Sequence, residues 1–152
     1  MSVPVRRAGA GDIEALAPLF DAYRQFYSQP ADLARSRDFL QQRIAHEESV
    51  LWLAEREGVV LGFTQLFRMF SSVRTARIWV LNDLYVAPDA RRGGVARRLL
   101  DAATQFARED GAARIVLETT RDNAAARALY RNAGWAEDDS QWYGLSLNPQ
   151  GD

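Results

Sequence analysis

A glycine-rich turn between an apolar strand and an amphipathic helix constrains this chain more than any other feature. The turn reads Arg91-Arg92-Gly93-Gly94-Val95-Ala96; it follows the strand-like run Leu84–Val86 and opens a helix predicted to end near Asp110. The first amides of a helix have no intrahelical acceptor, and the helix dipole adds about half a positive charge there. A strand, turn and helix in this order predict a phosphate-binding site.

Composition excludes several classes of function. The 152 residues suit one domain, which we expect over 1–147 with a frayed tail at 148–152. A formal net charge of −1 argues against a nucleic-acid partner. No apolar run has the ~20 residues of a membrane span, and the start lacks a signal peptide, so we expect a cytoplasmic protein. Without cysteine and with one histidine, we expect no metal site.

Hydrophobic periodicity predicts an α/β chain. Gly11-Asp12 marks the start of a first helix, which Pro30 ends, and Glu57-Gly58 marks a hairpin between two strands. We expect helices at 31–45 and 95–110, and one that Asn123 caps and Gly134 ends. We expect strands at 3–7, 50–55, 59–67, 76–86 and 114–119, a loop at 68–75, and a final pair of strands at 135–137 and 141–147.

A second motif lies on the last predicted helix. It contains Asn123, Ala126, Leu129 and Tyr130, and Gly134-Trp135 follow it. Taken alone, Asn123 is an N-cap and Tyr130 a core residue. The order is the specific signal: a strand, Arg91-x-x-Gly94-x-Ala96, a helix, a strand, and then this motif.

In that order the chain resembles the GNAT superfamily of N-acetyltransferases, which transfer acetyl from acetyl-CoA to an amine. The likeness is specific from about Leu81 to Trp135. It implies a central mixed sheet of about six to seven strands, flanked by about four helices and splayed between the fourth and fifth strands. It also implies acetyl-CoA as cosubstrate and a homodimer.

The resemblance further implies the residues that hold the cofactor. Backbone amides from Arg92 to Arg97 would bind the CoA pyrophosphate, and the Arg91 and Arg92 side chains can add charge-assisted contacts. The main chain around Tyr85 would bind the pantetheine arm, and Tyr130 would lie beside its sulfur. The full cofactor set is Leu84, Tyr85, Val86, Arg91, Arg92, Gly93, Gly94, Val95, Ala96, Arg97, Asn123, Ala126, Arg127 and Tyr130.

The catalytic candidates are Tyr130, Asp83 and Asn82. The leaving thiolate benefits from a proton donor, which makes Tyr130 the candidate general acid. Asn82 stands where many relatives have a glutamate, and an amide cannot act as a base. Strict alternation places Asn82 on the face of Leu84 and Val86 and Asp83 on the other face, and a bulge would reverse this. The base is Asp83, or a water chain leads to Asp83, Glu118 or bulk solvent.

The acceptor is the least defined part of the prediction. Tyr23, Phe26 and Tyr27 on the first helix are core residues or line a pocket for a cationic amine. We expect direct attack, in a ternary complex, by a small primary amine such as a polyamine, an amino acid or an aminosugar. The alternatives are a protein N-acetyltransferase and a non-catalytic acyl-CoA-binding or regulatory module.

Overall fold

The computed structural model describes residues 3–148 and divides into two compact units. The first unit runs to Glu118 and contains the sheet and three helices; the second begins at Thr119 and contains one short helix. Each unit is described by itself. Most of the predicted tail, 149–152, lies outside the described residues, and the prediction of a single domain stays a prediction.

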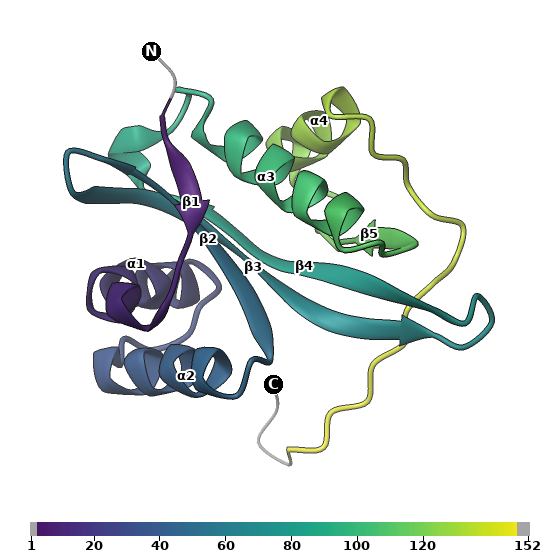
Figure 1. Ribbon diagram of the computed structural model, residues 1–152, viewed down its shortest axis with the longest axis horizontal. Coiled ribbons are helices and arrows are strands. Elements are labelled where there is room, and N and C mark those ends of the chain that lie inside the picture. Colours follow the sequence, from purple (N-terminus) through teal and green to yellow (C-terminus); the bar gives the residue numbers. More distant parts are fainter. Residues whose placement is uncertain (1–2, 149–152) are drawn as a thin grey trace. The chain divides into compact units, whose positions relative to one another are not determined.

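The first unit is built on a mixed five-stranded sheet in the order β1-β2-β3-β4-β5 (Figure 1). The first four strands are antiparallel neighbours, and β5 is parallel to β4. The strands are β1 Val5–Arg7, β2 Ser49–Arg56, β3 Val59–Ser71, β4 Ala76–Val86 and β5 Arg114–Val116.

Two turns set the lengths of the central strands. Glu57 and Gly58 both have positive φ, 52° and 78°, as a two-residue hairpin turn requires, so the predicted hairpin is confirmed. The predicted start of the next loop, at Arg68, is wrong. Strand β3 continues to Ser71, which pairs with Ala76. Each of these extra residues gains a cross-strand partner.

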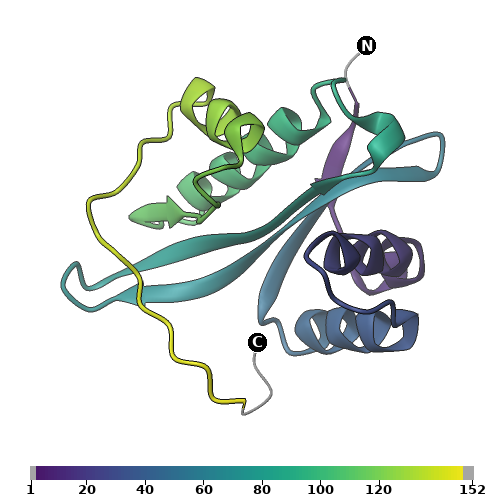
Figure 2. The same cartoon turned by 180° about the vertical axis from the view of Figure 1, so that it is seen from behind.

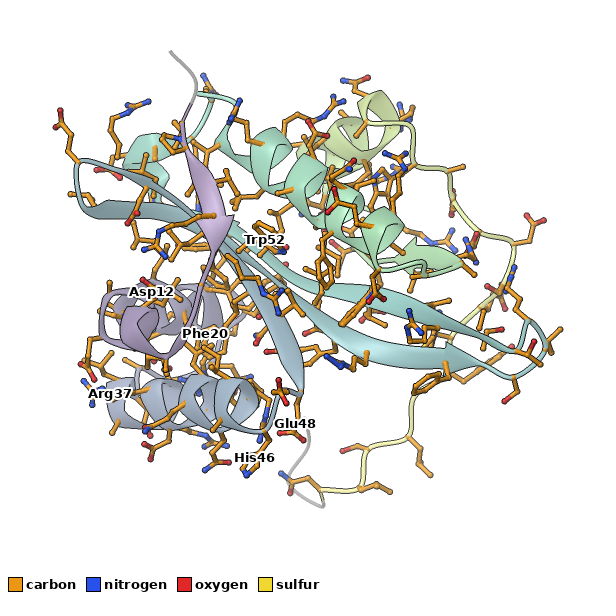
Figure 3. All side chains as sticks on the ribbon, in the orientation of Figure 1. Asp12, Phe20, Arg37, His46, Glu48 and Trp52 are labelled. Atoms are coloured by element: carbon orange, nitrogen blue, oxygen red, sulfur yellow. The ribbon has the colours of Figure 1, made fainter. Side chains whose placement is uncertain are left out.

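Two helices cover one face of the sheet and one helix covers the other (Figures 1 and 2). The first face holds α1, Ile13–Phe26, and α2, Leu33–Ala45; the second holds α3, Val95–Glu109. Short 3-10 turns at Ala10–Asp12 and Pro88–Ala90 precede α1 and follow β4. Figure 3 labels one side chain from each face of the sheet. Phe20 belongs to the hydrophobic cluster beneath α1, and Trp52 packs against the cluster beneath α3.

A buried carboxylate joins α1 to α2. Asp21 on α1 is 7% exposed and accepts hydrogen bonds from Ser36 Oγ at 2.6 Å, Asp32 N at 3.1 Å and Arg24 Nη1 at 3.0 Å. The Ser36 hydrogen bond is the main reason why the pKa of Asp21 is lowered, against the opposing effect of burial. These bonds satisfy a charge that would otherwise be costly to bury.

The second unit contains α4, Ala124–Asn132, and then an extended chain. Gly134, with φ of 92°, follows the end of α4 as predicted. The final pair of strands predicted at 135–137 and 141–147 is wrong, since the described residues after α4 form no strand. A strand needs a hydrogen-bonded neighbour and a surface for its apolar side chains, yet Tyr143 and Leu147 are each 90% exposed.

The fold class is therefore confirmed, with fewer strands than expected. The described residues form an α/β fold with a mixed, open sheet and four α-helices, and the sheet has five strands. None of the helices within residues 3–148 has the length and apolar character needed to span a bilayer.

Candidate active site

The parallel strands β4 and β5 pair over a short distance and then part. Within the described chain they are paired only from Ile78 to Val80 and from Arg114 to Val116, while β4 continues to Val86. The predicted splay between the fourth and fifth strands is thus present. Beyond Val80 the edge of β4 that faces away from β3 has no paired strand in the described sheet.

The backbone groups on that edge follow from strand geometry. Ala87 N donates to Leu61 O at 2.8 Å, so the Ala87 amide is directed toward the β3 side. Because successive residues direct their amides to opposite sides of a strand, the amides of Leu84 and Val86 are directed toward the gap. A polar backbone edge of this kind can bind an extended, amide-containing ligand arm.

The turn after β4 leads to a helix start without a side-chain cap. Gly94 is the N-cap with φ of 81°, a left-handed conformation that glycine adopts without strain. The first backbone bond into α3 runs from Arg98 N to Gly94 O at 3.1 Å. None of the described residues in the first turn of α3 has an acidic side chain. An uncapped helix start of this kind suits an anion, and phosphate binding at these amides stays a prediction.

Arg91 connects this turn to the end of β4. Its Nε donates to Val86 O at 2.9 Å, and its guanidinium lies 5.4 Å from the centre of the Tyr85 ring. The arginine thus fixes the turn against the strand edge. The Val86 carbonyl is on the same side of β4 as the Val86 amide, and it is already occupied by this bond.

A bulge in β4 lies beside the side chain that faces α1. Gln65 is opposite Asp83 and Leu66 is opposite Leu81, so Asn82 is the extra residue in the ladder. Asn82 is exposed, whereas Asp83 is 3% exposed and lies on the α1 face. Asp83 lies on the α1 face with Tyr85, opposite Leu84 and Val86, as strict alternation predicts, and the bulge leaves Asn82 exposed outside the ladder.

The Asp83 carboxylate has two side-chain partners among the described residues. Gln65 Nε2 donates to Oδ2 at 2.6 Å, and Tyr23 Oη donates to Oδ1 at 3.2 Å. Ser49 Oγ donates in turn to Gln65 Oε1 at 2.8 Å, which fixes the orientation of the amide. Burial raises the pKa of Asp83 to about 6, and the bonds from Gln65 and Tyr23 oppose that rise.

An aromatic cluster surrounds this carboxylate. The half-buried Tyr23 ring contacts Phe63 and Tyr85 at centroid distances of 5.7 and 5.8 Å. Tyr27 lies 5.3 Å from the Tyr23 ring and is 55% exposed, and Phe26 is 60% exposed. Of the three aromatic residues predicted to line an acceptor pocket, Tyr23 is thus part of the core and of the Asp83 site, while Phe26 and Tyr27 are exposed beside it.

The remaining predicted site residues lie in the second unit. Asn123 Oδ1 accepts a bond from Ala126 N at 3.2 Å, so Asn123 is the N-cap of α4. Arg127 Nη1 donates to Arg121 O at 3.1 Å. The half-buried Tyr130 ring lies 6.1 Å from the Trp135 ring. Their roles toward a cofactor stay predictions.

Sequence reasoning missed Gln65 and Ser49. The available signal was a polar pair, Thr64-Gln65, inside an otherwise apolar strand; both residues are fully buried. Buried polar side chains require partners, and Asp83 provides one for each, through its carboxylate for Gln65 and its carbonyl for Thr64. A search of residues 3–148 finds no cluster of three or more side chains suited to hold a metal ion.

Comparison with known proteins identifies the family. The model of the acetyltransferase (GNAT) family matches residues 16–135. The chain belongs to this family. The protein is therefore an acetyltransferase, as the order of motifs predicted.

Individual relatives agree with this assignment. This acetyltransferase is 46% identical over 134 residues to the uncharacterized N-acetyltransferase YhfO of Bacillus subtilis, covering 88% of this chain and 90% of that protein. It is 33% identical to a probable acetyltransferase of Haemophilus influenzae, over 76% and 80% of the two chains. The crystal structure of a probable acetyltransferase, 40% identical, superposes with a TM-score of 0.91 over 95% of this chain and 98% of that one.

Replacement of Asp83 by Asn tests the buried charge through stability. The pKa of Asp83 is raised from 3.8 to about 6, so its contribution to stability is fully present below about pH 3.8 and is lost as pH rises through about 6. The Asp83→Asn variant has no ionisable group at this position, so its stability does not fall in this way as pH rises. We expect its free energy of unfolding, relative to the unsubstituted protein, to rise by about 3 kcal/mol between about pH 4 and about pH 8.

Urea denaturation at each pH measures this difference. Asp38→Asn, at an exposed position on α2, is the matched control for the change of side chain. A relative stability of Asp83→Asn that does not change with pH would contradict the assignment of a raised pKa to Asp83.

Proposed function

We propose that this acetyltransferase transfers acetyl from acetyl-CoA to the primary amine of a small molecule by direct attack in a ternary complex. The observation that supports this best is the continuity of two backbone sites in the first unit. The edge of β4 that has no paired strand in the described sheet ends at Val86, the uncapped amides of α3 begin at Val95, and Arg91 between them is bonded to Val86 O. One site suits an amide-containing arm and the other a diphosphate, in the order in which CoA carries them.

In this proposal CoA lies along the β4 edge. The Leu84 and Val86 amides bind the pantetheine arm on either side of Tyr85, and the backbone amides from Arg92 to Arg97 bind the pyrophosphate. The Leu84 amide also polarises the thioester carbonyl, because an N–H aimed at a developing oxyanion stabilises the transition state. On α4, Asn123, Ala126 and Arg127 contact the cofactor, and Tyr130 lies beside its sulfur.

The acceptor enters beside the exposed aromatics of α1. Phe26 and Tyr27 are exposed and lie next to Tyr23, so their rings can stack on a cationic amine. An aminoglycoside N(6')-acetyltransferase of Klebsiella aerogenes is 31% identical over 102 residues, which supports an amine of the polyamine, amino acid or aminosugar kind. The expected homodimer and cytoplasmic location stay predictions.

Two side chains carry the protons. Asp83, with a pKa of about 6, is ionised at neutral pH and serves as the base. Tyr130 donates a proton to the leaving thiolate. Asn82 takes no part in proton transfer, because its side chain is an amide and is exposed at the bulge. The chain has no cysteine for an acyl-enzyme, which favours direct attack.

Turnover with a panel of amines tests the proposal. We expect acetyl-CoA-dependent release of CoA with at least one polyamine, amino acid or aminosugar, and intersecting lines in double-reciprocal plots, because both substrates must be bound before transfer. Parallel lines would contradict direct attack. Tight binding of CoA without turnover on any amine or peptide N-terminus would favour the non-catalytic module, and turnover on peptides alone would favour a protein N-acetyltransferase.

Replacement of Tyr130 by Phe tests the general acid. The change removes only a hydroxyl group, so the ring contact with Trp135 is retained. We expect kcat to fall about 100-fold with KM for acetyl-CoA unchanged, since a general acid acts in the transition state. Full turnover by Tyr130→Phe, with Tyr143→Phe as the matched control at a 90% exposed position, would exclude this role.

A further inference from the structure

The Asp83 carboxylate is too deeply buried to touch an acceptor amine. The residue is 3% exposed, and its carboxylate oxygens are both hydrogen-bonded inside the first unit. A base must lie within hydrogen-bond reach of the proton that it takes, directly or through one intervening group. A neighbour of Asp83 must therefore connect it to the amine.

The inner neighbour cannot carry a proton. The Gln65 amide N–H donates to Asp83 Oδ2, and the Gln65 amide oxygen accepts a bond from the Ser49 hydroxyl. Both Gln65 and the bond to Ser49 are buried, and a carboxamide is neither an acid nor a base near neutral pH. Ser49 and Gln65 therefore fix the orientation of the carboxylate, and the route to the substrate lies on its other side.

The outer neighbour is Tyr23. Its hydroxyl lies 3.2 Å from Asp83 Oδ1 and 3.3 Å from the carbonyl oxygen of Asn82, the bulge residue. The ring is held by edge contacts with Phe63 and Tyr85 and is half-buried. Toward the exposed side it contacts Tyr27, which the proposed acceptor pocket contains. The phenol thus lies between the buried carboxylate and the exposed aromatics.

We propose that Tyr23 is a further catalytic residue, whose hydroxyl takes the proton from the acceptor nitrogen while passing its own proton to Asp83 Oδ1. The inference rests on the proposed function, in which Asp83 is the base. It assigns to Tyr23 a role beyond lining the pocket, and it explains how a buried base can serve an amine that it does not touch.

The proton and electron movements balance. The amine lone pair forms the C–N bond, the thioester carbonyl opens to an oxyanion, and the nitrogen becomes positively charged and acidic. The N–H bond breaks as its proton moves to Tyr23 Oη, and the Tyr23 O–H bond breaks as that proton moves to Asp83. The C–S bond then breaks with re-formation of the carbonyl, and the thiolate takes a proton from Tyr130. Both groups return to their initial protonation states by exchange with water.

Other ionisable groups of the described residues lie around this pair. Tyr85 shares the α1 face of β4, and Arg91 lies over its ring. Asp21 on α1 is directed to α2, where Ser36 and Arg24 bond it. Tyr27 also contacts the Tyr23 ring, and the hydrogen bond from Tyr23 Oη to Asp83 Oδ1 makes these two groups the pair between which a proton can pass.

Tyr23→Phe, compared with Asp83→Asn and with the control Tyr143→Phe, tests the role. Each tyrosine variant loses one hydroxyl and keeps its ring; Tyr143 is 90% exposed and its hydroxyl contacts Gln141. For Tyr23→Phe we expect kcat to fall about 100-fold at about pH 8, with acetyl-CoA binding retained and the acid limb near pH 6 lost from the pH–rate profile. Tyr143→Phe should leave kcat and that limb unchanged.

A proton inventory of the unsubstituted enzyme in mixtures of H2O and D2O gives a second measurement that needs no variant. Two protons moving in one step predict a curved dependence of kcat on the deuterium fraction, and a linear dependence would overturn the relay. Asp83→Asn inactive with Tyr23→Phe fully active would also overturn it while leaving Asp83 as the base. An unsubstituted enzyme that acetylates no amine would instead refute the proposed function itself.

Discussion

The structure depends on the point at which β4 and β5 part. A strand inside a sheet satisfies its backbone groups on both sides, but β4 loses its second partner after Val80 and continues to Val86. The side toward β3 remains bonded, as the pair from Ala87 to Leu61 shows, so the strand keeps its shape while its other edge faces the gap. The uncapped start of α3 follows within the same turn. These two sets of backbone groups follow each other in the chain, and Arg91 between them is bonded to Val86 O.

The bulge at Asn82 adds the chemistry to this backbone frame. One extra residue, Asn82, interrupts the ladder of β4 with β3, and Asp83 directly after it lies on the α1 face in contact with Gln65 and Tyr23. A buried carboxylate costs stability, which is expressed here as a pKa raised to about 6. The fold tolerates that cost because both carboxylate oxygens are bonded and because Ser49 fixes the Gln65 amide. A carboxylate with this pKa is ionised at neutral pH and can still accept a proton, which is the property that a base requires.

Elements determined by local backbone chemistry could be predicted from the sequence. Glu57-Gly58 required a tight turn, Gly94 suited the start of a helix, and Asn123 capped α4. Features that depend on residues far apart in the chain could not be predicted from the sequence. The bulge is a matter of register between β3 and β4, so the sequence could not place Asn82 in it, although alternation correctly placed Asp83 opposite Leu84 and Val86. The bond from Gln65 to Asp83 joins residues 18 positions apart in the chain. The last predicted strands failed for the same reason, because alternation in 141–147 indicates a strand but cannot supply its neighbour.

Hydrogen exchange of single backbone amides, measured by NMR with and without CoA, tests the central claim most directly. The account predicts that the Leu84 and Val86 amides exchange quickly in the free protein and slowly once CoA is bound, together with the amides of the first turn of α3. The amides of Tyr85 and Ala87, directed toward β3, should be protected in both states. Slow exchange of Leu84 and Val86 without CoA, or no change when CoA binds, would contradict the claim that this edge of β4 holds the cofactor.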